Sequence, residues 1–160
     1  MDHKTTNKKM NQYIKELFHE EDWHLRAEAA LQLGHLKDAR ATNLLCRALQ
    51  KEEDPSVVNR IIEALGKIGD PRATIRIIER LEKEIKKEPL DKFKITYMIE
   101  SLMELQDKRA LTPISRFLNS EDQDLKDLAE KAFDKILPNW REIIEKERNK
   151  SVSDIFHLKM

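Results

Sequence analysis

Residues 33–41 read LGHLKDARA, and the pattern returns 32 residues later as LGKIGDPRA at residues 65–73. A weaker copy, LMELQDKRA, follows after a further 37 residues at residues 102–110. A period of this length is typical of chains built from stacked helical repeats. The sequence therefore predicts an all-α solenoid, in which each repeat buries its apolar side against the next one.

The segments on both sides of the motif have the spacing of amphipathic helices. Before the motif of the first repeat, apolar residues recur at three- and four-residue steps at Leu25, Ala29, Leu33 and Leu36. The same spacing follows each motif, so each repeat is expected to contain a first and a second helix. Nine helices are expected, at residues 6–19, 22–35, 39–51, 55–68, 71–87, 92–105, 108–119, 121–136 and 139–149. The earliest of them matches a second helix, so the chain is expected to open on a half-repeat.

The expected helix starts carry residues that cap helices. Asp54-Pro55 and Asp70-Pro71 place an N-capping carboxylate before a proline at the first helical position, where the missing N–H is not needed. Asp38, Asp91 and Asp107 supply the same cap elsewhere. Residues 120–123 and 139–142 are interpreted as capping boxes.

Length and composition limit the organisation and the function classes. The 160 residues contain 30 basic and 30 acidic side chains, a balance that argues against a large surface for nucleic acid or membrane. No apolar run reaches the length of roughly 20 residues that spans a bilayer, and no secretory signal is recognisable, so a cytoplasmic location is expected. Cys46 is the only cysteine, which excludes an internal disulfide and a metal site of several cysteines. One domain over residues 1–150 is expected, with residues 151–160 as a C-terminal tail.

The pattern in which Leu25-Arg26, Ala29-Ala30 and Leu33-Gly34 precede Asp38 and Arg40 resembles HEAT repeats of the phycocyanobilin-lyase type. The resemblance covers roughly residues 10–137 and is weaker in the third and fourth repeats. It implies a right-handed α-solenoid of about four HEAT-like helical hairpins, with the second helices lining the concave side. Families with this fold mostly bind other macromolecules, and a minority are enzymes.

The repeated motif residues favour a structural role. Each Asp of the motif is expected to cap a helix, and each Arg to reach the Asp of a neighbouring repeat in a ladder. Metal-dependent relatives of this fold carry facing His-Glu pairs, whereas here only His19-Glu20 occurs. Cys46 has no histidine at a usable spacing on its helix. No catalytic, cofactor or metal site is therefore expected.

Aligned second helices indicate a candidate binding surface. One column of exposed positions alternates in sign, as Glu16, Arg47, Glu79 and Arg116. Because packed helices lie about 8–10 Å apart, these charges are expected to pair between repeats, and no continuous positive stripe for phosphates results. Neighbouring columns contain Ile75 and Ile78, which either present apolar surface or are covered by residues 82–88. The candidate partner-binding residues are Asn43, Arg47, Ile75, Ile78, Glu79, Thr112 and Arg116.

The sequence favours an interaction scaffold that binds a protein or peptide on the concave face, with no nucleic-acid or membrane partner. A lyase-like or chromophore-handling protein is the second hypothesis, and it depends on the resemblance alone. A DNA glycosylase of related fold is a third, which the mixed charges disfavour. The sequence leaves the partner and the oligomeric state open.

Overall fold

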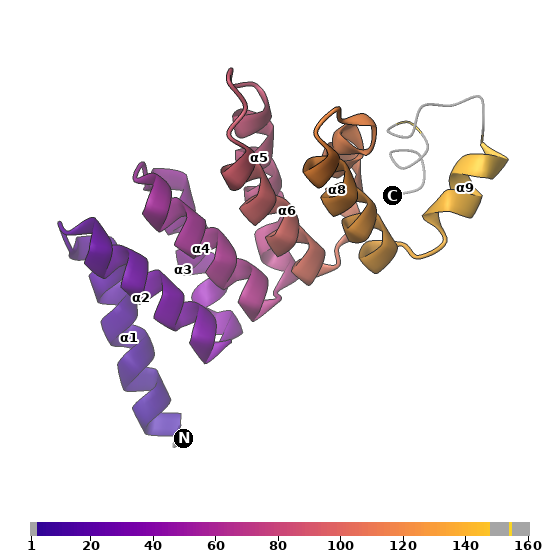
Figure 1. Cartoon of the computed structure of the whole chain (residues 1–160). Coiled ribbons are helices and arrows are strands. Elements are labelled where there is room, and N and C mark those ends of the chain that lie inside the picture. Colours follow the sequence, from indigo (N-terminus) through magenta and orange to yellow (C-terminus); the bar gives the residue numbers. More distant parts are fainter. Residues whose placement is uncertain (1–2, 148–153, 155–160) are drawn as a thin grey trace. The chain divides into compact units, whose positions relative to one another are not determined.

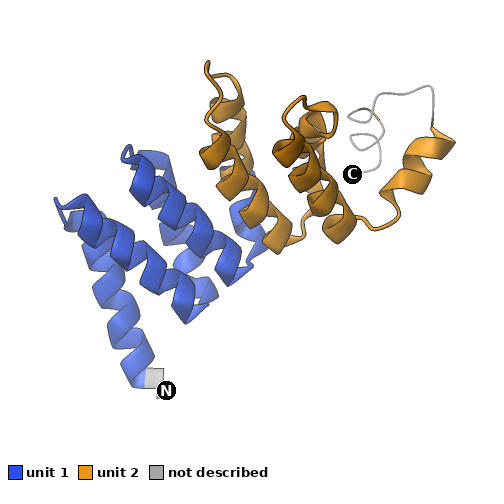
Figure 2. Cartoon of the chain, viewed as in Figure 1, with its two compact units in different colours: residues 1–76 blue, residues 77–160 orange. Residues whose placement is uncertain are grey.

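Helices make up both of the compact units into which the chain divides. The computed structural model describes residues 3–147 and 154, and the contacts define unit 1, residues 1–76, and unit 2, residues 77–160 (Figure 2). The described residues form α-helices and short 3-10 helices and contain no strand. The predicted all-α class is therefore confirmed. Within this part of the chain, no helix combines the length and the apolar character needed to cross a membrane.

Unit 1 has two layers of helices. It contains α1 (His3–His19), α2 (Trp23–Leu36), the 3-10 turn η1 (Ala39–Ala41), α3 (Thr42–Lys51), α4 (Pro55–Ile68) and the 3-10 turn η2 (Pro71–Ala73). The first helices α2 and α4 pack side by side, α1 packs on α2, and α3 packs on α4 (Figure 1). The opening helix α1 thus lies in the layer of second helices, as the half-repeat interpretation expects.

Unit 2 begins within the next second helix. This helix, α5 (Thr74–Ile85), starts in unit 1 and continues in unit 2. The further elements are α6 (Lys92–Leu105), η3 (Lys108–Ala110), α7 (Leu111–Ile114), η4 (Ser115–Asn119), α8 (Gln123–Ile136) and α9 (Trp140–Lys146). The first helices α6 and α8 pack together, and α8 also packs on α7 and η4. The expected tail, residues 151–160, lies outside the described residues except for Asp154.

The helix expected at residues 108–119 is the main departure from the predicted elements. It consists of two 3-10 segments around the single α-helical turn of α7. Pro113 lies in the single turn of α7, where a helix tolerates its missing N–H, and from Ser115 onward the segment continues as a 3-10 helix. The remaining elements agree with the expected ranges to within a few residues.

Aspartates cap the helices at most of the expected positions. Asp54 accepts hydrogen bonds from the backbone N–H groups of Ser56 and Val57, and the Asp of each motif caps the 3-10 turn that follows it. The two predicted capping boxes are wrong. Asp122 rather than Ser120 caps α8, and the Asn139 side chain makes no capping hydrogen bond to α9.

The first helix of each complete repeat motif ends in a left-handed residue. Gly69 has φ 73°, and the equivalent Lys37 and Gln106 have φ 50° and 51°. Glycine adopts this conformation without the strain that a Cβ causes. Replacing Lys37 with glycine is therefore expected to stabilise the protein by about 0.5–1 kcal/mol. Urea unfolding measures this change. The matched exchange His35→Gly, at an exposed position inside α2, is expected to destabilise it.

Candidate partner-binding surface

The seven predicted contact residues are distributed over both units. Unit 1 contains Asn43, Arg47 and Ile75, and unit 2 contains Ile78, Glu79, Thr112 and Arg116. Most of these side chains are exposed, whereas Ile78 and Thr112 are half-buried. All of them belong to the second helices α3, α5, α7 and η4. Within unit 1, Asn43 and Arg47 lie one helical turn apart on α3 and share a face.

Ile75 is an exposed apolar side chain on the helix α5. It is 41% exposed, whereas Ile77 and Leu81 on the same helix are fully buried. The alternative that residues 82–88 cover this position is therefore wrong for Ile75. The helix α5 ends at Ile85, so residues 82–85 extend its end rather than folding back over its first turn.

The expected pairing of opposite charges between repeats does not occur between Glu16 and Arg47, the two residues of this column in unit 1. The carboxylate of Glu16 accepts a hydrogen bond of 2.8 Å from Gln12, one turn earlier on α1. Among the described residues, Arg47 has no carboxylate within 4 Å. The Gln12–Glu16 contact is local to one helix and needs no alignment between repeats, so it forms in place of the predicted pair.

The repeated Asp and Arg of the motif serve the structure in a different way from the predicted ladder. Arg72 pairs with Asp70 of its own repeat at 2.5 Å and donates to the carbonyl oxygen of Ala39 in the preceding repeat at 2.9 Å. Asp70 also accepts a hydrogen bond from the buried hydroxyl of Thr42. Hydrogen bonding to Arg72 lowers the pKa of Asp70. Within unit 1, the motif of Asp70 and Arg72 is thus linked to the preceding repeat through a threonine and a carbonyl group.

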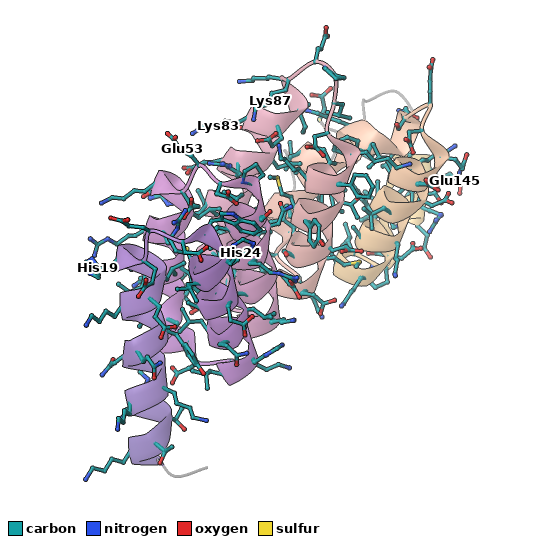
Figure 3. All side chains as sticks on the ribbon, turned by 60° about the vertical axis from the view of Figure 1, so that its left-hand side comes forward. His19, His24, Glu53, Lys83, Lys87 and Glu145 are labelled. Atoms are coloured by element: carbon teal, nitrogen blue, oxygen red, sulfur yellow. The ribbon has the colours of Figure 1, made fainter. Side chains whose placement is uncertain are left out.

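The candidate metal residue His19 and the candidate nucleophile Cys46 lie on different helices of unit 1, α1 and α3. No group of three His, Cys, Asp or Glu side chains in the described ranges, 3–147 and 154, is placed to hold a metal ion. His19 lies at the end of α1, and Figure 3 shows it well apart from His24 on the surface of unit 1. Cys46 is buried, and burial raises the pKa of its thiol. This is opposite to the shift that activates a cysteine nucleophile.

A hollow that the sequence analysis did not predict lies between α1 and α3, and Arg47 is one of its lining residues. Its lining includes the half-buried Ile14 and Phe18 of α1 and the exposed Lys51 of α3. Both apolar residues occupy core positions by helical spacing, and periodicity alone does not indicate that this side of α1 remains open. The sequence did contain one indication of an open surface here: Lys15 lies in the column of exposed positions next to Glu16.

Comparison with protein families relates part of the chain to a known repeat. The family model that describes HEAT repeats matches residues 11–88, from within α1 to just beyond α5. Comparison with curated proteins gives no match. The more specific phycocyanobilin-lyase type and the handedness of the stack stay predictions. Residues 11–88, slightly less than half of the chain, are therefore similar to HEAT repeats, and the described part of the chain is all-α.

Proposed function

We propose that the chain is a non-catalytic scaffold that binds a protein or peptide partner on the exposed side of its second helices. HEAT repeats are generally a non-enzymatic scaffold fold that mediates protein–protein interaction, which supports the class of function. The observation that carries the proposal is the exposure of Ile75 on α5. Apolar residues surrounded by polar ones are typical of protein interfaces.

The charge distribution supports a protein partner over a nucleic acid. The chain has a formal net charge of zero, and within unit 2 the candidate residues include both the acidic Glu79 and the basic Arg116. A phosphate backbone favours a continuous row of cations, because its binding energy comes largely from released counterions. A protein surface of mixed charge complements such a pattern better.

The test compares two equivalent substitutions at exposed apolar residues. Ile75→Asp changes a second helix, and Leu25→Asp changes the first helix α2, where Leu25 is 49% exposed. Partners are captured from lysate on the immobilised full chain and quantified by mass spectrometry. We expect at least one protein to be lost about tenfold or more with Ile75→Asp and retained with Leu25→Asp, because a buried charge in an interface is costly.

Circular dichroism on both variants controls for folding. Ile75 is the better position for this test than Ile78, which is half-buried, since a charge at Ile78 would also destabilise the fold. A set of captured proteins that does not depend on Ile75 would contradict the proposed surface. The alternative, a lyase-like or chromophore-handling protein, predicts visible absorbance from a bound pigment after purification from the native source.

A further inference from the structure

A shallow hollow of about 590 Å³ lies between α1 and α3. Binding sites for small molecules or side chains commonly enclose roughly 300–1,000 Å³. Both helices belong to unit 1, so the hollow is formed within one compact unit. Its lining residues are Asn11, Ile14, Lys15, Phe18 and His19 from α1, and Leu44, Arg47 and Lys51 from α3.

The floor of the hollow is apolar and partly open to solvent. Ile14, Phe18 and Leu44 line it, and all three are half-buried. Their apolar neighbours Leu17 and Leu45 are almost fully buried in the core. Covering the accessible part of the floor removes apolar surface from water and so stabilises a complex. The floor therefore provides anchoring surface for apolar side chains of a partner.

The rim of the hollow is positively charged and lacks compensating carboxylates. Lys15, Arg47 and Lys51 are exposed, and none of them has a carboxylate within 4 Å in the described part of the chain. His19 lies at the same rim, at the outer edge of unit 1 (Figure 3). By contrast, Arg26 on α2 is paired with a carboxylate at 2.9 Å. No acidic residue contributes to the lining.

We infer that this hollow binds an acidic amphipathic segment of a partner protein. Its bulky apolar side chains would cover Ile14, Phe18 and Leu44, while its Asp and Glu side chains face the three cations. This inference rests on the proposed function and specifies the partner's chemistry, because Arg47 belongs to both surfaces. A nucleic-acid duplex would match the cations alone, because its outward-facing phosphate backbone has no apolar groups for the floor.

The probe is a labelled synthetic peptide of about four helical turns, with Leu and Phe on one face and Asp and Glu elsewhere. Its binding to the full chain is followed by fluorescence anisotropy. Arg47→Glu/Lys51→Glu is expected to weaken binding at least tenfold, through both lost attraction and new repulsion. Lys8→Glu/Lys131→Glu, at exposed helical lysines outside the hollow, changes net charge equally and is expected to leave binding within about twofold.

Two further comparisons separate the floor from the rim. A peptide of the same composition with its apolar residues scattered is expected to bind at least tenfold more weakly, as is polyglutamate. Ile14→Gln, checked for folding by circular dichroism, is expected to weaken the amphipathic peptide and leave polyglutamate unchanged. Equal binding of the two peptides would overturn the inference, because the floor would then contribute nothing.

The remaining outcomes identify other occupants. Single-stranded DNA or anionic vesicles that bind more tightly than the peptide, and lose binding in the Arg47→Glu/Lys51→Glu variant, would overturn the assignment to a protein segment. Equal weakening by the control lysines would overturn the site itself. If the peptide does not bind but capture of a partner from lysate still depends on Ile75, the inference about the hollow is rejected and the proposed function stands. Peptide binding without any partner that depends on Ile75 would reject the wider docking surface and retain the hollow.

Discussion

Replacing Gly34 with alanine is expected to destabilise the protein by about 1–3 kcal/mol, measured by urea unfolding followed by circular dichroism. Gly34 lies on α2 where this helix approaches α4, and it is buried. A Cβ added there would lie 2.8 Å from the Cα and 3.0 Å from the Cβ of Ala64. The nearest atom is backbone, so α2 and α4 would have to separate, and the other contacts in this layer would loosen.

The sign of this effect tests the interpretation. Without the contact, glycine to alanine in a helix interior stabilises by roughly 0.5–1 kcal/mol. A Gly34→Ala variant as stable as the wild type would therefore contradict the close approach. Adding Ala64→Gly removes the Cβ of Ala64 and leaves its Cα, so the double variant is expected to recover only part of the loss. His35→Ala, at an exposed neighbouring position, serves as the control and is expected to change stability by less than about 0.5 kcal/mol.

The sequence predicts the order and limits of the helices well, because these depend on local signals. The aspartates at Asp54 and Asp70 cap the helical segments that follow them, and each is followed by a proline that fits only a helix start. The internal repeat then assigns each helix to a layer. Residues 108–119 depart from the expectation, since the segment continues as a 3-10 helix from Ser115 onward, although it keeps its place in the order.

The exposed surface is predicted less well, because it depends on contacts between segments distant in sequence. Helical spacing assigns Leu25 to the core, yet it is 49% exposed, while its equivalent Val57 is fully buried. The predicted pairing of Glu16 with Arg47 fails because a polar neighbour on the same helix is available. The open floor of the hollow depends on which side of α1 faces α2, and amphipathic spacing gives that direction only approximately.

A half-buried ion pair between Arg26 and Glu52 connects two loops of unit 1. The guanidinium of Arg26 donates to both carboxylate oxygens of Glu52, at 2.9 and 3.1 Å. It also donates to the carbonyl oxygens of Glu20 and Glu21, in the loop between α1 and α2. Glu52 in turn accepts from the backbone N–H of Asp54, where α4 begins. One side chain therefore links the α1–α2 loop to the α3–α4 loop.

Replacing Arg26 with alanine is expected to cost about 2–3 kcal/mol at pH 7. Breaking a fully buried pair costs roughly 3–5 kcal/mol, and an exposed pair contributes about 0–1 kcal/mol. The side chains of Arg26 and Glu52 are 18% and 12% exposed, which places this pair between the two limits and nearer the buried one. Arg60→Ala removes an exposed pair with Glu63 and is expected to cost less than about 1 kcal/mol.

The pH dependence distinguishes the ion pair from simple packing by Arg26. Burial raises the pKa of Glu52, but the hydrogen bonds from Arg26 and Asp54 outweigh it, so the pKa lies below its ordinary value of 4.5. A carboxylate with a lowered pKa stabilises the fold above its unfolded pKa, and this contribution is lost as the pH falls through the folded value. The stability difference between wild type and Arg26→Ala is therefore expected to shrink between pH 5 and pH 3. Hydrogen bonds from His24 chiefly lower the pKa of the exposed Asp22, and the charge of Arg26 adds a small further lowering. Carboxylates distant from Arg26 are present in both proteins and cancel in this difference.

Arg26→Lys separates charge from geometry at the same position. Lysine keeps the positive charge but does not provide the planar fork that binds both oxygens of Glu52 and two carbonyl groups at once. We expect a loss of stability intermediate between wild type and Arg26→Ala, because the hydrogen bonds to the α1–α2 loop are not replaced. A lysine variant as stable as the wild type would show that charge alone is required. The stability difference between wild type and Arg26→Ala could instead stay constant from pH 7 to pH 3. That result would show that the aliphatic part of Arg26, and not its pairing with Glu52, stabilises this junction.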